Sequence, residues 1–183
     1  NSSIKGNSNS SDKKTTIINL FEESNLVFLQ GGPGTGKSTL ILETILYYLN
    51  KNNNINIGLS APTGKASSRL KESLDYKKKF DYKDEIDKIE CQTLHRWIYN
   101  SINKSGKLKY DLKELDIFVI DEMSMVNVDL FEIILNSLAK DCKLLLVGDA
   151  NQLPPINSSS IWNYIFSNLT KNPFDSSIVN LEK

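Results

Sequence analysis

The amino-acid sequence predicts an α/β fold in which a mostly parallel sheet is covered by helices on both faces. The first observation is a series of short apolar runs without alternating polar residues, which is typical of strands buried on both faces. Segments with the helical spacing of apolar residues separate these runs, as in strand–helix–strand units. The unusual glycine-rich and acidic motifs follow directly after the runs, where parallel sheets bind their ligands.

The individual elements are assigned from periodicity and from turn-forming residues. Residues 38–50 place Ile41, Ile45 and Leu49 four residues apart, so these side chains share one face of a helix. Residues 75–90 mix lysine with aspartate, and we expect a solvated excursion there. The predicted strands are residues 26–30, 55–60, 117–120, 143–147 and 178–181, and the predicted helices are residues 15–23, 38–50, 65–74, 93–102, 128–139 and 161–167.

Length and composition are those of one globular domain. The 183 residues are 39% hydrophobic, enough for a full-sized core, yet no apolar run reaches the roughly 18 residues that predict a membrane-spanning helix. Residues 1–13 are rich in serine, asparagine and charge, so we expect a disordered tail before one domain over residues 14–183. Because the chain begins with Asn1 instead of methionine, we expect a fragment of a longer protein.

Charge and cysteine content narrow the function classes. The 22 basic and 22 acidic residues cancel, so net charge gives no support for a nucleic-acid partner, and we expect no membrane partner. Cys91 and Cys142 are too few for a disulfide framework or a metal cluster. We expect both to be reduced thiols in a cytoplasmic protein.

The stretch GGPGTGKST joins the predicted strand at residues 26–30 to the predicted helix at residues 38–50. It fits the phosphate-loop pattern G-x-x-x-x-G-K-[ST] in the required context. Backbone N–H groups of such a loop point at an anion, and the helix start adds positive potential. We expect Lys37 to reach the β- and γ-phosphates and Ser38 to bind Mg²⁺. The residues expected to hold the nucleotide are Gly31, Gly32, Pro33, Gly34, Thr35, Gly36, Lys37, Ser38 and Thr39.

Two adjacent carboxylates follow the predicted strand at residues 117–120. Because parallel strands end at one edge of a sheet, we expect these acids to lie near the phosphate loop. Asp121 is then expected to hold Mg²⁺, and Glu122 to act as general base toward the attacking water.

The stretch GDANQLPP follows the predicted strand at residues 143–147. An uncharged amide beyond a strand end can hydrogen-bond a γ-phosphate oxygen or the attacking water, so Gln152 is the expected sensor and a catalytic candidate. Asp149 is expected to brace the site, and Pro154 and Pro155 to stiffen the chain as it leaves.

Other interpretations of these motifs stay open. Taken singly, the acid pair and the GDANQLPP stretch also fit ordinary solvated turns. A kinase would share the phosphate loop but would want a lid rich in arginine, whereas residues 75–90 offer lysines mixed with acids. A non-catalytic regulatory module would bind nucleotide without needing both acids.

Five motifs in this order, GGPGTGKST, SAPTGKASSRL, TLHRW, VIDEMSMV and LLLVGDANQLPP, resemble the first five motifs of superfamily 1 helicases. The middle three are similar in particular to the RecD-like group, which includes the alpha subunit of exodeoxyribonuclease V (the RecBCD enzyme) and stand-alone relatives. The resemblance covers residues 14–183. It implies a RecA-like P-loop ATPase domain, the first of two motor domains of an ATP-dependent DNA helicase in recombination and repair. It also implies 5′ to 3′ movement and a location in the bacterial cytoplasm.

The resemblance also assigns roles to residues outside the phosphate loop. It gives Gln152 the coupling of the γ-phosphate to DNA. Lys65 and Arg69 are candidates to neutralise DNA phosphates, with a solvated helix face as the alternative. The residues that it places along single-stranded DNA are Pro62, Thr63, Gly64, Thr93 and His95.

The resemblance also implies partners, and the sequence lacks two features that are expected of that group. The implied partners are single-stranded DNA and RecB- and RecC-like subunits, while a stand-alone helicase and an RNA substrate stay open. A glutamine that reads adenine is expected near Lys13 or Lys14, but the first glutamine is Gln30. The arginine finger belongs to a second motor domain, and no arginine follows Arg96. Such a finger contributes about 10³ to 10⁵ in rate, so we expect slow hydrolysis by this chain alone.

Overall fold

A six-stranded sheet forms the centre of the computed structural model, and its strand pairings are parallel. The structure describes residues 10–78, 86–103, 108–152, 161–169 and 177–181. The strands are β1 (Leu26–Gly31), β2 (Ile57–Ala61), β3 (Ile89–Thr93), β4 (Ile117–Ile120), β5 (Lys143–Gly148) and β6 (Ile178–Leu181), in the spatial order β3-β2-β4-β5-β1-β6.

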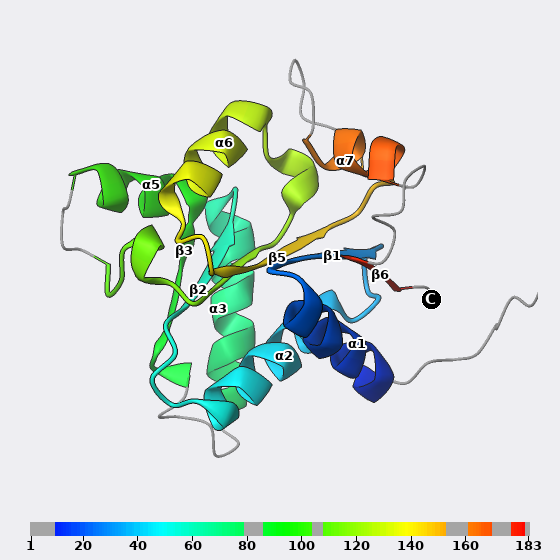
Figure 1. The fold of residues 1–183 in the computed structure, drawn as a ribbon, viewed down its shortest axis with the longest axis horizontal. Helices are drawn as coiled ribbons and strands as arrows, with labels where there is room; N and C mark the ends of the chain where they lie inside the picture. Colours follow the sequence, from blue (N-terminus) through cyan, green and yellow to red (C-terminus); the bar gives the residue numbers. More distant parts are fainter. Residues whose placement is uncertain (1–9, 79–85, 104–107, 153–160, 170–176, 182–183) are drawn as a thin grey trace, which may run out of the picture.

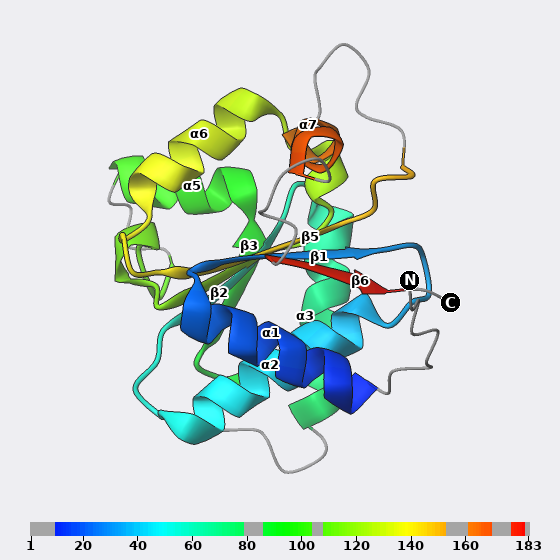
Figure 2. The ribbon, with the colours of Figure 1, turned by 45° about the vertical axis from the view of Figure 1, so that its right-hand side comes forward.

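Helices cover both faces of this sheet, which confirms the predicted α/β class (Figures 1 and 2). Three of them, α1, α2 and α3, lie on one face, and α5, α6 and α7 lie on the other with two short 3-10 turns. In the part of the chain that the structure describes, no helix is long and apolar enough to cross a membrane. The bounds are α1 (Ser10–Glu23), α2 (Lys37–Lys51), α3 (Gly64–Lys78), α5 (Leu94–Asn103), η1 (Leu112–Glu114), η2 (Met123–Met125), α6 (Val128–Ser137) and α7 (Ile161–Leu169).

The strands β1, β4 and β5 supply apolar side chains to both layers. In β1, Val27 and Leu29 pack in the core cluster beneath α1, α2 and α3, whereas Phe28 packs in the cluster beneath α5, α6 and α7. Successive side chains of a strand point to opposite faces, so a strand covered on both faces must be apolar at every position. This packing explains the continuous apolar runs from which the strands are predicted.

One strand of the sheet, β3, is missing from the prediction. The sequence indicates a solvated excursion over residues 75–90, but α3 continues to Lys78 and Ile89 opens β3. Residues 79–85 lie outside the described residues. Every residue of β3 is half-buried because this strand lies at the edge of the sheet, and its sequence IECQT therefore lacks an apolar run.

The first helix also begins earlier than predicted. The sequence indicates a tail over residues 1–13 and a helix from residue 15, whereas α1 begins at Ser10. Asp12 lies in the first turn, where a negative charge favours the helix dipole, and Thr16 Oγ1 donates to Asp12 O at 2.9 Å. Residues 1–9 lie outside the described part of the chain. The other predicted helices differ from those observed by a few residues at their ends.

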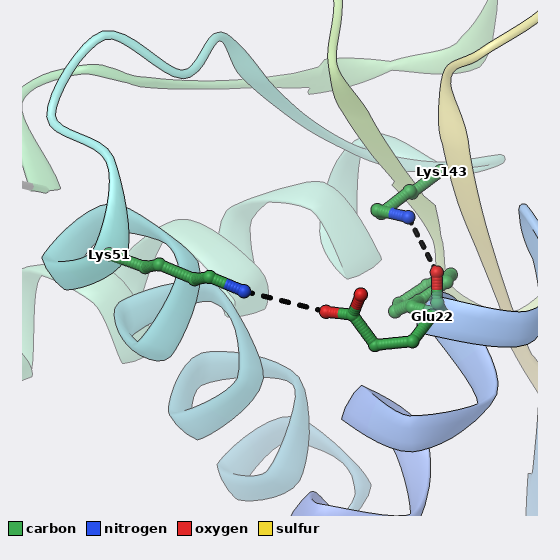
Figure 3. A network of polar contacts seen from close by, with 4 residues as sticks. Glu22, Lys51 and Lys143 are labelled. Atoms are coloured by element: carbon green, nitrogen blue, oxygen red, sulfur yellow. Dashed lines mark hydrogen bonds and ion pairs between the residues drawn. The ribbon is translucent and has the colours of Figure 1, made fainter.

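Polar contacts attach the end of α1 to the sheet and to α2 (Figure 3). Lys143 Nζ at the start of β5 donates to Phe21 O at 2.6 Å and lies 5.7 Å from the centre of the Phe21 ring. A cation at the last carbonyls of a helix is favourable. Glu22 and Lys51 pair at 3.5 Å, but both side chains are more than half exposed, so this pair contributes little.

Candidate nucleotide and nucleic-acid site

The loop between β1 and α2 has the backbone geometry of a phosphate cradle. Gly34 and Gly36 adopt φ angles of +74° and +87°, which side-chain-bearing residues rarely adopt. Thr35 Oγ1 donates to Gly32 O at 2.8 Å and closes the loop from within. Lys37 Nζ donates to the same Gly32 carbonyl at 2.9 Å, so the ammonium group is held at the loop. These two bonds hold the shape of the loop and keep the lysine ammonium beside it.

The acid pair continues from β4 through a strained turn. Asp121 N donates to Ser60 O at 2.9 Å, which extends the ladder between β4 and β2 by one residue. Glu122 has φ 54° and ψ 41°, the one positive φ of a non-glycine residue among those described. A left-handed conformation costs roughly 1–2 kcal/mol for such a residue. It turns the chain from β4 into η2, and strain of this kind concentrates at functional sites.

A cavity of about 340 Å³ at the carboxyl ends of β1, β4 and β5 brings the predicted catalytic residues together. Lys37, Asp121, Glu122 and Gln152 all line it, although they come from three separate segments of the chain. This volume is within the range of small-molecule sites. The lining residues are Pro33, Gly34, Lys37, Ser38, Ala66, Arg69, Leu70, Asp121, Glu122, Ser124, Gly148, Asp149 and Gln152.

The remaining residues predicted to hold the nucleotide do not line the cavity with their side chains. Most of them shape the loop instead, as the bonds of Thr35 to Gly32 show. Thr39 lies exposed in the first turn of α2. The predicted nucleotide residues outside the lining are Gly31, Gly32, Thr35, Gly36 and Thr39.

Burial raises the pKa of both acids above their ordinary values. The pKa of Asp121 rises because the carboxyl is desolvated, while a bond from Glu122 N at 2.8 Å and the charge of Lys37 lower it in part. The pKa of Glu122 rises through desolvation and then through repulsion by Asp121, against the opposing charges of Arg69 and Lys37. The two cations thus favour the ionised forms of a partly desolvated acid pair.

These residues fit a Mg²⁺-bound nucleotide. Asp121 and the Ser38 hydroxyl supply the oxygen ligands that Mg²⁺ prefers, and the desolvated Asp121 carboxylate gains from a cation. The described residues hold no group of three His, Cys, Asp or Glu side chains that would bind a metal unaided. Mg²⁺ commonly takes one or two protein oxygens and completes its shell with substrate phosphate oxygens and water, which agrees with Asp121 and Ser38 as its candidate ligands.

Gln152 is exposed at the rim of this cavity, on the segment after β5. Ser124 Oγ donates to Gln152 Oε1 at 3.1 Å. Asp149 is only 3% exposed, and its Oδ1 accepts from Asn151 N at 2.9 Å, which holds the turn that carries Gln152. Pro154 and Pro155, predicted to stiffen this segment, lie outside the described residues.

A second cavity of about 390 Å³ gathers three of the five residues predicted to contact DNA. Pro62, Thr63 and His95 line it, on segments that follow β2 and β3. Gly64 opens α3 and Thr93 ends β3, and neither lines this cavity. The other lining residues come from η2 and α6 and are Met125, Asn127, Asp129, Leu130 and Ile133.

Arg69 is an exposed residue of α3 that lines the nucleotide cavity, and its charge acts on Glu122. Its role toward DNA phosphates stays a prediction. Lys65 is exposed and lines neither cavity. Helical spacing does place residues 65 and 69 one turn apart, but only the packing of α3 beside the phosphate loop shows which of them faces the nucleotide.

Gln30 has a structural role. Its Oε1 accepts hydrogen bonds from Ala150 N and from Trp162 Nε1, both at 3.0 Å. These bonds tie the end of β1 to the segment after β5 and to α7. Lys13 and Lys14, where an adenine-reading glutamine is expected, lie in α1.

The AAA domain family matches residues 14–158 of this chain. The match covers the phosphate loop, the acid pair and Gln152, and all lining residues of the cavity lie inside it. The chain belongs to this family of AAA domains.

Within this class the chain is similar to RecD proteins. It is 41% identical over 161 residues to the RecBCD enzyme subunit RecD of Buchnera aphidicola subsp. Schizaphis graminum, a match covering 83% of this chain and 26% of that protein. It is 30% identical over 148 residues to the ATP-dependent RecD2 DNA helicase of Deinococcus radiodurans, covering 81% of this chain and 19% of that protein. The chain thus spans about a quarter or less of these relatives.

Solved helicase structures share the fold. A structure of Pif1 helicases at forked double-stranded DNA superposes with a TM-score of 0.54 at 23% identity, covering 94% of this chain and 43% of that one. A DEAD box protein from Methanococcus jannaschii gives 0.61 at 23% identity, covering 93% and 49%. At this level of identity the likeness concerns the fold, and it agrees with the predicted RecA-like arrangement.

Proposed function

We propose that this chain is the ATP-hydrolysing motor domain of a RecD-like, ATP-dependent DNA helicase that acts in recombination and repair. The observation that carries the proposal is the convergence of Lys37, Ser38, Asp121, Glu122 and Gln152 on one cavity. The family match and the similarity to RecD proteins support it.

The chain's own residues account for the chemistry of hydrolysis. Lys37 exchanges its bond with the Gly32 carbonyl for the β- and γ-phosphate oxygens of ATP. Ser38 and Asp121 hold Mg²⁺, which when bound neutralises charge on the phosphate oxygens. Ionised Glu122 accepts a proton from water as the water oxygen bonds to the γ-phosphorus and the bond to the bridging oxygen breaks. ADP and inorganic phosphate leave.

Single-stranded DNA is the proposed polymer partner. The residues proposed to contact it lie where β2 and β3 end, and Gln152 couples them to the γ-phosphate. Because this chain spans 26% and 25% of two RecD relatives, 5′ to 3′ movement and any RecB- or RecC-like partners are proposed for the full-length parent protein. We also propose that this chain alone hydrolyses ATP slowly, since no arginine follows Arg96 to act as a finger.

The test is ATP hydrolysis by the full-length parent protein with and without single-stranded DNA. We expect strong stimulation by DNA, abolished by Lys37→Ala. Hydrolysis that proceeds equally well without DNA would contradict the motor function and favour a small-molecule substrate.

A further inference from the structure

Two adjacent side chains of η2 face the two cavities at the edge of the sheet. Ser124 is 1% exposed and lines the nucleotide cavity, whereas Met125 is 44% exposed and lines the second cavity. We propose that Ser124 and Met125 form a relay that couples a nucleic-acid strand in the second cavity to the nucleotide, with Ser124 as the positioning residue of Gln152. The inference rests on the proposed function and assigns its coupling to two further residues.

The order of the strands places η2 between the two cavities. β4, which leads into η2, lies between β2 and β5 in the sheet. β2 leads to Pro62 and Thr63 in the second cavity, and β5 leads to Gln152 in the nucleotide cavity. Any shift of the segment after β4 therefore displaces residues that line both cavities.

Ser124 determines which end of the Gln152 amide is free. Its Oγ donates to Gln152 Oε1 at 3.1 Å, so the acceptor end of the amide is engaged by the protein. The amide nitrogen, which carries two N–H donors, is left for a phosphate oxygen or the attacking water. Without the hydroxyl, the exposed Gln152 side chain loses the partner that orients it.

Two backbone bonds link the residues of this short turn to one another. Met125 N donates to Glu122 O at 2.9 Å, and Val126 N donates to Met123 O at 3.1 Å. Met123 is fully buried and holds the turn in the core beneath α7. Glu122 begins the turn in its left-handed conformation, so contact of a strand with Met125 acts on the base as well as on Ser124.

The second cavity suits the sugar or base of a strand more than its phosphate. It has no lysine or arginine among its lining residues, and it includes the carboxylate of Asp129. Met125, Leu130 and Ile133 provide apolar contact next to His95, Pro62 and Thr63. A strand that lies here touches Met125 through its uncharged parts.

The experiment measures the affinity of the full-length parent protein for a non-hydrolysable Mg-ATP analogue, with and without a saturating thymidine oligonucleotide. Allosteric coupling of this kind typically changes affinity about 5- to 150-fold. We expect Ser124→Ala and Met125→Ala each to bring this ratio to about 1. The affinity of each variant for the analogue without DNA and its melting temperature are measured beside the ratio. Ser124→Thr, which keeps a hydroxyl, is expected to restore the ratio.

Matched controls and the possible outcomes separate the relay from the proposed function. Ser137→Ala removes a hydroxyl that bonds within α6, and Leu135→Ala shortens an exposed side chain outside both cavities. Both are expected to keep the ratio. If the unsubstituted protein shows no ratio above 1, the proposed motor function fails. If the unsubstituted protein shows a ratio above 1 and Ser124→Ala keeps it, the relay is overturned and the function stands. The relay is likewise overturned if Ser124→Ala lowers analogue affinity and melting temperature as much as it lowers the ratio.

Discussion

The two cavities at the carboxyl edge of the sheet differ in charge although they lie on neighbouring strands. The nucleotide cavity contains two cations, Lys37 and Arg69, together with three acids, Asp121, Glu122 and Asp149. The second cavity contains one acid, Asp129, and an apolar wall, with no lysine or arginine among its lining residues. The first therefore offers cations and Mg²⁺ ligands to a polyanion, and the second offers neither a lysine nor an arginine.

This difference shows how one edge of a sheet can provide sites for two different ligands. Ends of β1, β4 and β5 form the charged cavity, and ends of β2 and β3 form the apolar one. The phosphate loop contributes to the charged cavity alone, and only that cavity has lysine and arginine among its lining residues. The predictions below test this contrast, from the largest expected effect to the smallest.

Glu122→Gln is expected to have the largest effect, and that effect should fall on the rate of hydrolysis and not on nucleotide binding. The amide cannot accept the proton of the attacking water, so kcat of the full-length parent should fall roughly 10²- to 10⁴-fold. Nucleotide affinity, measured by equilibrium titration, should be retained. The control is Glu132→Gln, an exposed acid of α6 outside both cavities. Unchanged kcat in Glu122→Gln would remove this residue as the base.

Lys37→Ala is expected to weaken ATP binding to this chain. Loss of a charged partner of this kind costs about 2–5 kcal/mol, or roughly 30- to 4,000-fold in dissociation constant. Isothermal titration of Mg-ATP measures the change, with Lys113→Ala on η1 as the control. An equal loss in both variants would mean that general surface charge, and not the cradle, binds the nucleotide.

Gly148→Ala is expected to destabilise the floor of the charged cavity. A Cβ at this position would lie 2.6 Å from Trp162 Cε2, and the indole is held by its bond to Gln30. Overpacking of this kind costs about 1–3 kcal/mol in the free energy of unfolding. Denaturant unfolding measures it, against Gly64→Ala, where a Cβ meets nothing within 4 Å. A stability unchanged by Gly148→Ala would show that the indole moves aside.

His95→Ala and Lys65→Ala are expected to differ in their dependence on salt. A stacking side chain contributes about 1 kcal/mol or more per base, so His95→Ala should weaken oligonucleotide binding roughly fivefold with an unchanged salt slope. Lys65→Ala should instead reduce that slope, because an exposed lysine acts on phosphates. Binding measured across a salt series separates the two. A reduced slope in His95→Ala would contradict the apolar character of the second cavity.

Asp121→Asn is expected to have the smallest effect. It should raise the stability of the fold, whereas Gly148→Ala should lower it. Because burial raises the pKa of Asp121 above 3.8, the folded chain binds a proton more readily than the unfolded chain does. The free energy of unfolding therefore falls as pH rises from the pKa of Asp121 in the unfolded chain to its raised pKa in the folded chain, and it stays lower above that range.

The substitution removes this cost, so the melting temperature without Mg-ATP should rise at pH 7. The gain should shrink as pH falls through the raised pKa. A melting temperature that falls at pH 7 would show that the bond from Glu122 N outweighs the desolvation of the carboxylate.

Much of the nucleotide cavity is predictable because its signals are local. The spacing of glycines, Lys37 and Ser38 is contained in nine residues, and the acid pair follows an apolar run of four. β3 escapes prediction because an edge strand packs on fewer neighbours and needs no apolar run. The place of Arg69 in the lining of the nucleotide cavity is not predicted, because helical periodicity shows which residues share a face, but not what that face contacts.

Local sequence therefore decides every strand except β3, most of the helices, the phosphate loop and the candidate reacting groups, since each depends on residues a few positions apart. The tertiary structure alone decides that Arg69 lines the nucleotide cavity and that Ser124 and Met125 line different cavities. Both outcomes follow from the strand order β3-β2-β4-β5-β1-β6 and from the packing of α3 and η2. That order results from how whole strand–helix units pack on one another, and the spacing of residues within a single unit does not contain it.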